Sequence, residues 1–202
     1  MHGLDLSGVE SSYAANGFGT LFYALARSLR PASAVELGTF KGYSALHLAA
    51  GMRDGGRSGA SLHLLDLWSD YRFRHCPRAE VEERMRRNGL LDVPGLRVEL
   101  RQSDVLTCAG GYLDESVDLL HIDVSHDAET LRAVLERWAV KVRRDGVLLF
   151  EGGSAERDRV PWMLAYGKVP IESLLRGDWF RERFDAVVLP PYPSLTIARR
   201  RP

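Results

Sequence analysis

The sequence predicts an α/β domain built on a doubly wound, mainly parallel sheet, and two observations indicate this class. Short apolar runs alternate along the chain with segments of helical period, as in βαβ units. Several of the runs are apolar on consecutive residues, which is typical of strands that helices cover on both faces. The five runs are Ala34–Leu37, Leu62–Leu65, Leu96–Leu100, Val117–Ile122 and Val147–Phe150.

Five helices are expected around these strands. They are Gly19–Leu29, Tyr43–Met52, Ala79–Asn88, Ala128–Val142 and Val160–Leu175. The fourth shows the clearest amphipathic pattern, because its apolar residues recur at the spacing of one buried helix face. That face comprises Leu131, Val134, Leu135, Trp138 and Val142.

The chain is predicted to end in an antiparallel pair of strands. A Pro-Pro-Tyr-Pro segment, which predicts a rigid loop, separates the two expected strands Phe184–Leu189 and Ser194–Ala198. Upstream, Asn88-Gly89 and Asp145-Gly146 supply the expected stops for the third and fourth helices. The last two strands would therefore complete an otherwise parallel sheet.

The chain length and the net charge limit the possible number of domains and the possible partners. The 202 residues are enough for one sizeable domain, 1–202, with a cap helix region at 1–30 and an insertion at 152–180 before the final hairpin. The 27 basic and 27 acidic residues cancel, so no long-range field recruits nucleic acid or an acidic membrane. We expect a small-molecule partner. The sequence is compatible with both a monomer and a homo-oligomer.

From the sequence we expect neither an export signal nor a membrane anchor. Its N-terminus lacks a cationic segment followed by an apolar one, and no apolar run is long enough to cross a bilayer. Cys76 and Cys108 lie far apart and outside C-x-x-C spacing, which favours two reduced thiols over a disulfide or zinc site. We expect a cytoplasmic protein.

Three strand ends carry residues suited to a cofactor. The first strand runs into Gly38–Gly42 and then a helix, so backbone amides can approach a ligand, although such a turn alone is as often a packing turn. The next strand ends in Asp66, where doubly wound folds place the acid that binds a ribose. Ser103-Asp104 follow the third strand, either as a loop turn or with a carboxylate that can meet an adenine amino group.

These motifs together resemble the class I S-adenosylmethionine (SAM) methyltransferases. The resemblance rests on ELGTFKGYS at residues 36–44, on Asp66, on Ser103-Asp104, on VDLLHIDVSHDAETLRAVLERW and on RRDGVLLFEGG. Within that superfamily the chain is similar to a small bacterial branch that includes macrocin-type sugar O-methyltransferases and related natural-product tailoring enzymes. The resemblance implies a Rossmann-like, seven-stranded sheet with a C-terminal antiparallel hairpin, and SAM as the cofactor.

The resemblance also implies a role for each matching residue. Glu36 and Gly38 would line the methionine end of SAM, Asp66 would hold the ribose and Asp123 would lie beside the transferred methyl. Ser103 and Asp104 would border the adenine. The full set of expected cofactor-binding residues is Glu36, Gly38, Thr39, Gly42, Ser44, Asp66, Leu67, Ser103, Asp104 and Asp123.

The expected reaction is methyl transfer to a small acceptor, at a hydroxyl of a secondary metabolite or sugar. The alternatives are an N- or C-methyltransferase and a SAM-binding accessory protein without catalysis. A nicotinamide-dependent dehydrogenase would share the turn and the ribose acid. The missing G-x-G-x-x-G speaks against that enzyme.

The fourth strand ends in His121-Ile122-Asp123-Val124-Ser125-His126-Asp127, and this cluster has two chemical interpretations. In the related sugar O-methyltransferases, acids at the ends of strands four and five hold a magnesium-type ion, which here would use Asp123 and Glu151. Glycine stands where a second strand-five acid is expected. The metal-free alternative has His126 as general base, with Asp123 or Asp127 orienting its ring. An inert His126 at a helix start is the structural alternative, and His121 is expected to be structural.

Acceptor contacts are expected from the segments peculiar to this chain. One is the loop after Asp66, where a substrate lid competes with a solvated loop that leads into a helix with a Glu83–Arg87 pair. The others are the N-terminal segment, the end of strand five and the 152–180 insertion, whose aromatic residues could equally be core. The candidate residues are Tyr13, Phe18, Tyr71, Arg72, Arg74, His75, Glu151, Trp162 and Tyr166.

Overall fold

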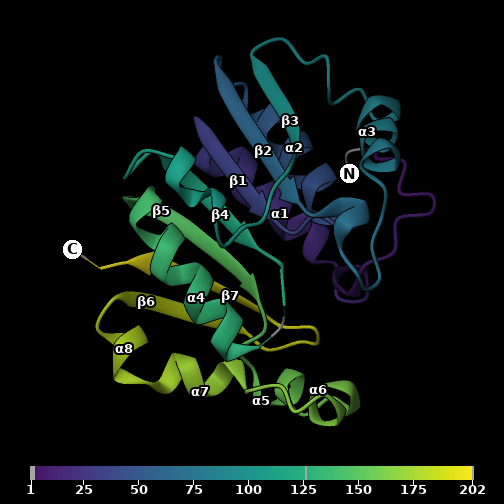
Figure 1. The fold of residues 1–202 in the computed structure, drawn as a ribbon. Helices are drawn as coiled ribbons and strands as arrows, with labels where there is room; N and C mark the ends of the chain where they lie inside the picture. Colours follow the sequence, from purple (N-terminus) through teal and green to yellow (C-terminus); the bar gives the residue numbers. More distant parts are fainter. Residues whose placement is uncertain (1–2, 126, 202) are drawn as a thin grey trace. The chain divides into compact units, whose positions relative to one another are not determined.

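The computed structural model describes residues 3–125 and 127–201 and confirms the predicted fold class. The strands follow the order β3-β2-β1-β4-β5-β7-β6 (Figure 1). Neighbours β1 and β2, β2 and β3, and β4 and β5 are parallel, whereas β7 is antiparallel to β5 and to β6. The strands are β1 Ser33–Leu37, β2 Ala60–Asp66, β3 Leu96–Gln102, β4 Val117–Ile122, β5 Val142–Glu151, β6 Phe184–Leu189 and β7 Leu195–Arg200.

One helix precedes β1, and the others connect the strands. The helices are α1 Phe18–Leu29, α2 Tyr43–Gly55, α3 Arg78–Arg87, α4 Ala128–Trp138, α5 Ala155–Asp158, α6 Pro161–Ala165, α7 Ile171–Arg176 and α8 Asp178–Arg181. Short 3₁₀ turns cover Ser12–Ala14, Trp68–Asp70, Cys108–Gly111 and Ala139–Lys141. None of the helices within residues 3–125 and 127–201 has the length and apolar character needed to cross a bilayer.

The chain divides into two compact units, Met1–Asp104 and Val105–Pro202. In the first, the leucines of β1 and β2 are buried, as the consecutive apolar runs predict. The register pairs Leu37 with Leu65, so the carboxyl ends of these strands are adjacent. This register places the turn after β1 beside the acid that ends β2.

The second unit is built around α4 and strands β4, β5, β7 and β6. All five residues of the predicted helix face are buried, although the last of them, Val142, begins β5. Trp138 is fully buried, and its indole N–H donates to the Val105 carbonyl at 2.7 Å. Asp127 caps the helix by accepting the N–H groups of Glu129 and Thr130, both at 3.1 Å. Periodicity and cap together explain why the start of this helix is correctly predicted, whereas its predicted end at Val142 is wrong because α4 ends at Trp138.

Two predicted elements are wrong in extent. Asp145-Gly146 ends no helix, because β5 already begins at Val142 and a Cβ at residue 146 would lie 3.0 Å from the Asp118 carbonyl of β4, where the strand register shifts. The predicted helix Val160–Leu175 is two helices, α6 and α7. Gly167 has a φ of 58° and Pro170 precedes α7, so the helix cannot continue through this segment.

Candidate functional site

The turn after β1 has the open backbone that a ligand needs. Gly38 and Gly42 both have a φ of 83°, which glycine adopts without strain. The Gly38 N–H donates to the Leu65 carbonyl at 2.8 Å, so the turn continues the β1–β2 ladder by one bond. A Cβ at residue 42 would lie 3.0 Å from a methyl of Val81. Both glycines are therefore required by local geometry.

The carboxylate of Asp66 holds this turn in place. Its Oδ2 accepts the backbone N–H groups of Thr39 at 2.7 Å and Phe40 at 3.0 Å, and its Oδ1 accepts that of Trp68 at 2.7 Å. Phe40 and Trp68 are non-glycine residues with φ values of 46° and 52°. Such conformations persist where surrounding contacts enforce them, and they cluster at functional sites. Asp66 thus stabilises two strained residues at once.

This arrangement limits what Asp66 can do for a ribose. An ionised carboxylate offers about four acceptor positions. Three are used by the backbone of residues 39, 40 and 68, so one remains for a ligand hydroxyl in this conformation. Asp66 is consequently a positioning group for the turn as well as a candidate ligand contact.

Further polar groups surround the turn: Glu36 on β1, Thr39 in the turn and Ser44 at the start of α2. Ser44 donates to Oε1 of Glu36 at 2.5 Å, and the Glu36 side chain is fully buried. The hydroxyl oxygen of Thr39 is buried and makes no hydrogen bond to any residue within the described part of the chain. A buried hydroxyl without a partner is costly, and a ligand in the turn would supply one. The donor set fits the amino and carboxylate groups of a methionine-type ligand.

The remaining predicted cofactor residues of this unit follow β2 and β3. The Ser103 N–H donates to the Asp66 carbonyl at 3.0 Å, which brings the ends of β2 and β3 together. Ser103 is half-buried, Asp104 is exposed and Leu67 is 36% exposed. The sequence-predicted residues from Glu36 to Ser103 therefore gather at the carboxyl ends of β1, β2 and β3.

The loop after Asp66 is tied to the turn and to the N-terminal segment. Glu10 pairs with Lys41 at 3.1 Å and also with Arg74, whose guanidinium lies 5.4 Å from the centre of the Phe40 ring. Tyr71, Arg72 and His75 are exposed. This arrangement is compatible with the predicted lid, which stays a prediction.

The N-terminal aromatic residues are part of the core of the first unit. Tyr13 is 1% exposed and packs edge-on against Phe22, with ring centres 5.0 Å apart. Phe18 is 8% exposed and its ring centre lies 6.1 Å from that of Tyr13. Both side chains face neighbouring aromatics of the same unit, so packing explains them without an acceptor.

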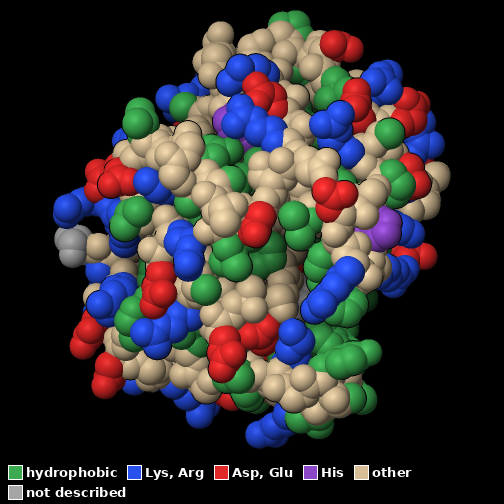
Figure 2. All heavy atoms as spheres, viewed as in Figure 1, with side chains coloured by type: hydrophobic (Ala, Val, Ile, Leu, Met, Phe, Trp, Pro, Cys, Tyr) green, Lys and Arg blue, Asp and Glu red, His purple; other side chains and the backbone are tan. Residues whose placement is uncertain are grey.

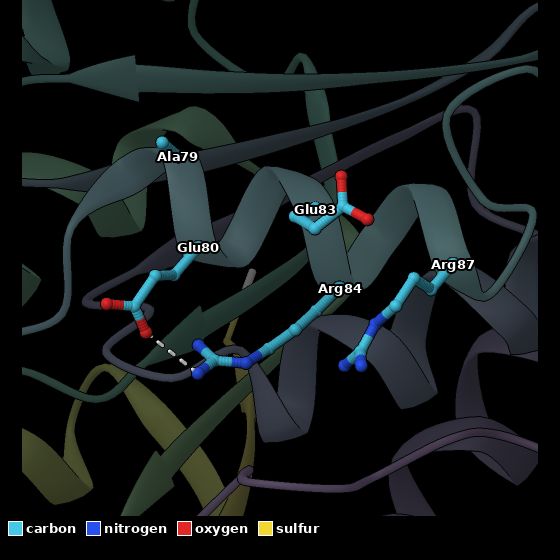
Figure 3. A pocket seen from close by; sticks show the side chains of 5 residues that line it. All are labelled: Ala79, Glu80, Glu83, Arg84 and Arg87. Carbon is cyan, nitrogen blue, oxygen red and sulfur yellow. Dashed lines mark hydrogen bonds and ion pairs between the residues drawn. The ribbon is translucent and has the colours of Figure 1, made fainter.

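A depression of about 340 Å³ lies on α3 and is lined by Ala79, Glu80, Glu83, Arg84 and Arg87 (Figure 3). Arg84 also donates to the Lys41 carbonyl of the turn at 3.4 Å. Glu80 and Arg84 pair at 3.0 Å. The predicted Glu83–Arg87 pair is wrong: Figure 3 shows the two side chains directed apart, since Glu83 pairs with Arg86 at 2.6 Å and Arg87 with Asp5 at 3.4 Å. The lining is balanced in charge and offers no reactive group.

The cluster after β4 belongs to the second unit. Asp123 is half-buried. His126, the predicted base, lies outside the described residues. Asp127 accepts from Ser125 at 2.7 Å, from the Thr130 hydroxyl at 3.0 Å and from Lys168 at 3.3 Å, in addition to the two amides of its cap. The acceptor positions of Asp127 are therefore filled by the α4 cap and these side chains.

The end of β5 does not offer a magnesium site. Glu151 is 5% exposed, and its Oε1 accepts Nε of Arg157 at 2.8 Å and Nη2 at 2.5 Å. Gly152 and Gly153 have φ values of 101° and 106°, and a Cβ there would lie 2.6 Å from the Ile171 Cδ1 and 2.5 Å from the Thr196 Oγ1. No acid fits at either position, which explains the glycines where a second ligand is expected.

Within residues 3–125 and 127–201, no group of three His, Cys, Asp or Glu side chains could hold a metal ion. Glu151 is instead neutralised by a guanidinium, and Arg157 is absent from the predicted site residues because no sequence spacing marks such a pair. The donor set of the described chain therefore does not fit the magnesium interpretation.

The aromatic residues of the insertion take different places. Trp162 is half-buried, with the guanidinium of Arg157 4.7 Å from its ring centre. Tyr166 is 77% exposed and Leu164 67% exposed, and Figure 2 shows hydrophobic side chains over α6. Trp162 thus lies beside the polar end of β5, whereas Tyr166 does not pack in the core of its unit.

The sheet order and the turn that leads from β1 into α2 define a Rossmann-like α/β domain of the kind that binds a nucleotide-bearing cofactor. Residues 35–151, more than half of the chain, match the family model described as a methyltransferase domain. The chain belongs to this methyltransferase family. None of the curated proteins matches the sequence.

Solved methyltransferase structures share the fold. A methyltransferase from Podospora anserina bound to S-adenosylhomocysteine (SAH) is 23% identical, with a TM-score of 0.65, over 91% of this chain and 78% of the other. An O-methyltransferase of tomaymycin synthesis from Streptomyces achromogenes, in complex with SAM, is 16% identical, with a TM-score of 0.64, over 95% and 87%. A Bacillus cereus O-methyltransferase with SAH is 20% identical, with a TM-score of 0.63, over 94% and 87%.

Proposed function

We propose that the protein is a SAM-dependent methyltransferase that methylates a hydroxyl of a small molecule, as part of natural-product tailoring. The observation that carries this proposal is the turn from Gly38 to Gly42, held open at the end of β1 by the carboxylate of Asp66. The fold of the SAM- and SAH-bound neighbours supports the choice of cofactor. The macrocin-type branch and the cytoplasmic location remain part of the proposal.

Most of the residues that would hold SAM follow β1, β2 and β3, and Asp123 would lie beside the transferred methyl. Glu36 and the hydroxyl of Thr39 would bind the methionine end, and the remaining acceptor position of Asp66 would bind one ribose hydroxyl. Ser103 and Asp104 would border the adenine. SAM supplies an electrophilic methyl group on a sulfonium, so the chain need only bind, orient and exclude water.

The residues that follow β4 would contribute the acceptor chemistry. A hydroxyl becomes a better nucleophile as its proton is removed, and a histidine with a pKa near neutrality suits this role. We propose that His126 removes the proton of the acceptor hydroxyl and that Asp123 orients the histidine ring. Asp127 is not available for this role because it caps α4. No step uses magnesium, because Glu151 is paired with Arg157.

The test combines binding with product analysis. SAM binding is measured by calorimetry, and reactions with hydroxylated metabolites are followed by mass spectrometry for SAH and a product 14 mass units heavier (about one CH₂). His126→Ala is expected to retain SAM binding and to lose about 10²-fold or more in turnover. Asp123→Ala is expected to lose a similar factor in turnover and to bind SAM more weakly, since Asp123 is also a predicted cofactor contact. Asp145→Ala is the matched control, since Asp145 is an exposed acid whose partner is Arg143.

The outcomes separate the rival functions. SAH formation with an O-methylated product supports the proposal. A methylated nitrogen or carbon would correct the acceptor atom, and SAM binding without SAH across the panel would favour an accessory protein. Full turnover in both His126→Ala and Asp123→Ala would leave proximity and orientation as the catalytic device and would remove both assigned roles.

A further inference from the structure

The guanidinium of Arg157 is buried but only partly satisfied. The residue is 2% exposed, and its side chain binds Glu151 through Nε and Nη2, both directed at Oε1. Its Nη1 is buried and makes no hydrogen bond within the described part of the chain. A guanidinium carries five N–H donors in a fixed planar fork. The edge formed by Nη1 and the outer hydrogen of Nη2 therefore remains for another acceptor.

Aromatic rings flank the same guanidinium. Its central carbon lies 4.7 Å from the centre of the Trp162 ring and 5.9 Å from that of the Tyr192 ring. These contacts involve the π-faces of the rings and do not provide in-plane oxygen acceptors for Nη1. Glu151 fixes the plane of the fork from one side, so the remaining edge has a defined direction.

A second unsatisfied polar group lies on the segment that carries Tyr192. Ser194 is fully buried, has a φ of 59°, and its hydroxyl makes no hydrogen bond to any residue in 3–125 or 127–201. Its carbonyl accepts the Gly152 N–H at 3.1 Å, which joins this segment to the end of β5 beside Glu151. Buried polar groups without partners are uncommon, so the Ser194 hydroxyl is a further group that a polar ligand at this end of β5 would satisfy.

We propose that the free edge of Arg157 binds a carboxylate of the acceptor molecule, and so selects acidic acceptors. Two parallel N–H groups match the two oxygens of a carboxylate, which a lysine ammonium could not do. Glu151 acts as a positioning residue that holds the fork. Tyr192 is 39% exposed, so one ring beside the guanidinium borders solvent. This inference rests on the proposed methyltransferase function, with Arg157 in the acceptor site.

Binding of small fluorinated probes tests the proposal without knowledge of the natural acceptor. The probes are 4-fluorobenzoate and trifluoroacetate, each compared with its neutral amide, and ¹⁹F NMR titrations are recorded on protein saturated with SAH. At least one carboxylate is expected to bind about ten-fold or more tightly than its amide. SAH binding in the same samples is measured by calorimetry.

Arg157→Lys keeps a cation beside Glu151 but removes the fork, and it is expected to weaken carboxylate binding about ten-fold or more. Arg159→Lys, an exposed arginine in the neighbouring turn, is the control and should bind as the wild type does. Because Arg157→Lys could misfold, the double variant Glu151→Gln/Arg157→Met replaces the buried pair by neutral groups of similar size. It should fold, bind SAH and lose the preference for the acid.

Three results would overturn the inference. These are equal binding of acid and amide, absence of binding by both acids, and wild-type carboxylate affinity in a folded Arg157→Lys or double variant. Failure of the proposed function looks different, because the wild-type protein would then fail to bind SAH in the calorimeter.

Discussion

Replacing Asp66 with alanine removes the carboxylate that accepts the backbone N–H groups of Thr39, Phe40 and Trp68. Phe40 and Trp68 have positive φ values, so the turn loses the bonds that hold two disfavoured conformations. The change also removes the remaining acceptor position that we assign to a ribose hydroxyl. We therefore expect the variant to lose both stability and affinity for SAM.

The magnitude follows from the number of bonds. Hydrogen bonds to a charged group contribute about 1.5–3 kcal/mol each, but Asp66 is half-buried and the released amides can turn to water. About 1 kcal/mol per bond gives a destabilisation of roughly 3 kcal/mol. For a chain of this size, that corresponds to a fall in Tm of about 6–12 °C. Loss of one charge-assisted ligand bond adds a fall in affinity of roughly 10- to 150-fold.

Thermal unfolding and calorimetric titration with SAM measure the two effects separately. Asp70→Ala is the matched control, since Asp70 is an exposed acid of the same loop whose carboxylate accepts from Gln102. It should leave Tm within about 2 °C and SAM affinity unchanged. A wild-type Tm for Asp66→Ala would refute the positioning role, and a lowered Tm with wild-type SAM affinity would refute the ligand contact.

Three further predictions concern the second unit. Gly153→Ala should cost about 2–3 kcal/mol in urea unfolding, because its Cβ would meet Thr196, whereas Gly110→Ala, with open space, should not. Burial raises the pKa of Asp127, but the hydrogen bonds from Thr130, Ser125 and Lys168 lower it by more, so the net pKa lies below the usual value of an aspartate. Its stabilisation is thus present above about pH 4 and lost below, so Asp127→Asn should be less stable at pH 7 and approach the wild type in acid titrations. Turnover should survive EDTA; loss restored by magnesium would contradict the metal-free site.

The parts of the fold set by local pattern were predictable. The α4 face recurs at helical spacing and is buried throughout, and β6 begins and ends where its apolar run does. The position of Asp66 followed from its place at the end of a strand. The sequence also contains the signal for the split between α6 and α7, although we predicted one continuous helix. Gly167 and Pro170 interrupt the helical period that Trp162 and Tyr166 suggest.

The contacts that decide chemistry were not predictable in the same way. Asp66 uses most of its acceptor positions to bind backbone N–H groups of the turn. This depends on the positive φ values of Phe40 and Trp68, which the residue types do not predict. The Glu151–Arg157 pair depends on how the chain bends at Gly152 and Gly153. Such ion pairs arise from tertiary geometry, so the sequence left the magnesium interpretation open.

Calorimetric titration of the purified protein with SAM, and in parallel with NAD⁺, tests the central claim most directly. Residues from Glu36 to Ser103 gather at the ends of β1, β2 and β3 and lack the glycine spacing of a dinucleotide site. The account predicts one bound SAM per chain and no heat with NAD⁺. Heat with NAD⁺ and none with SAM would contradict it.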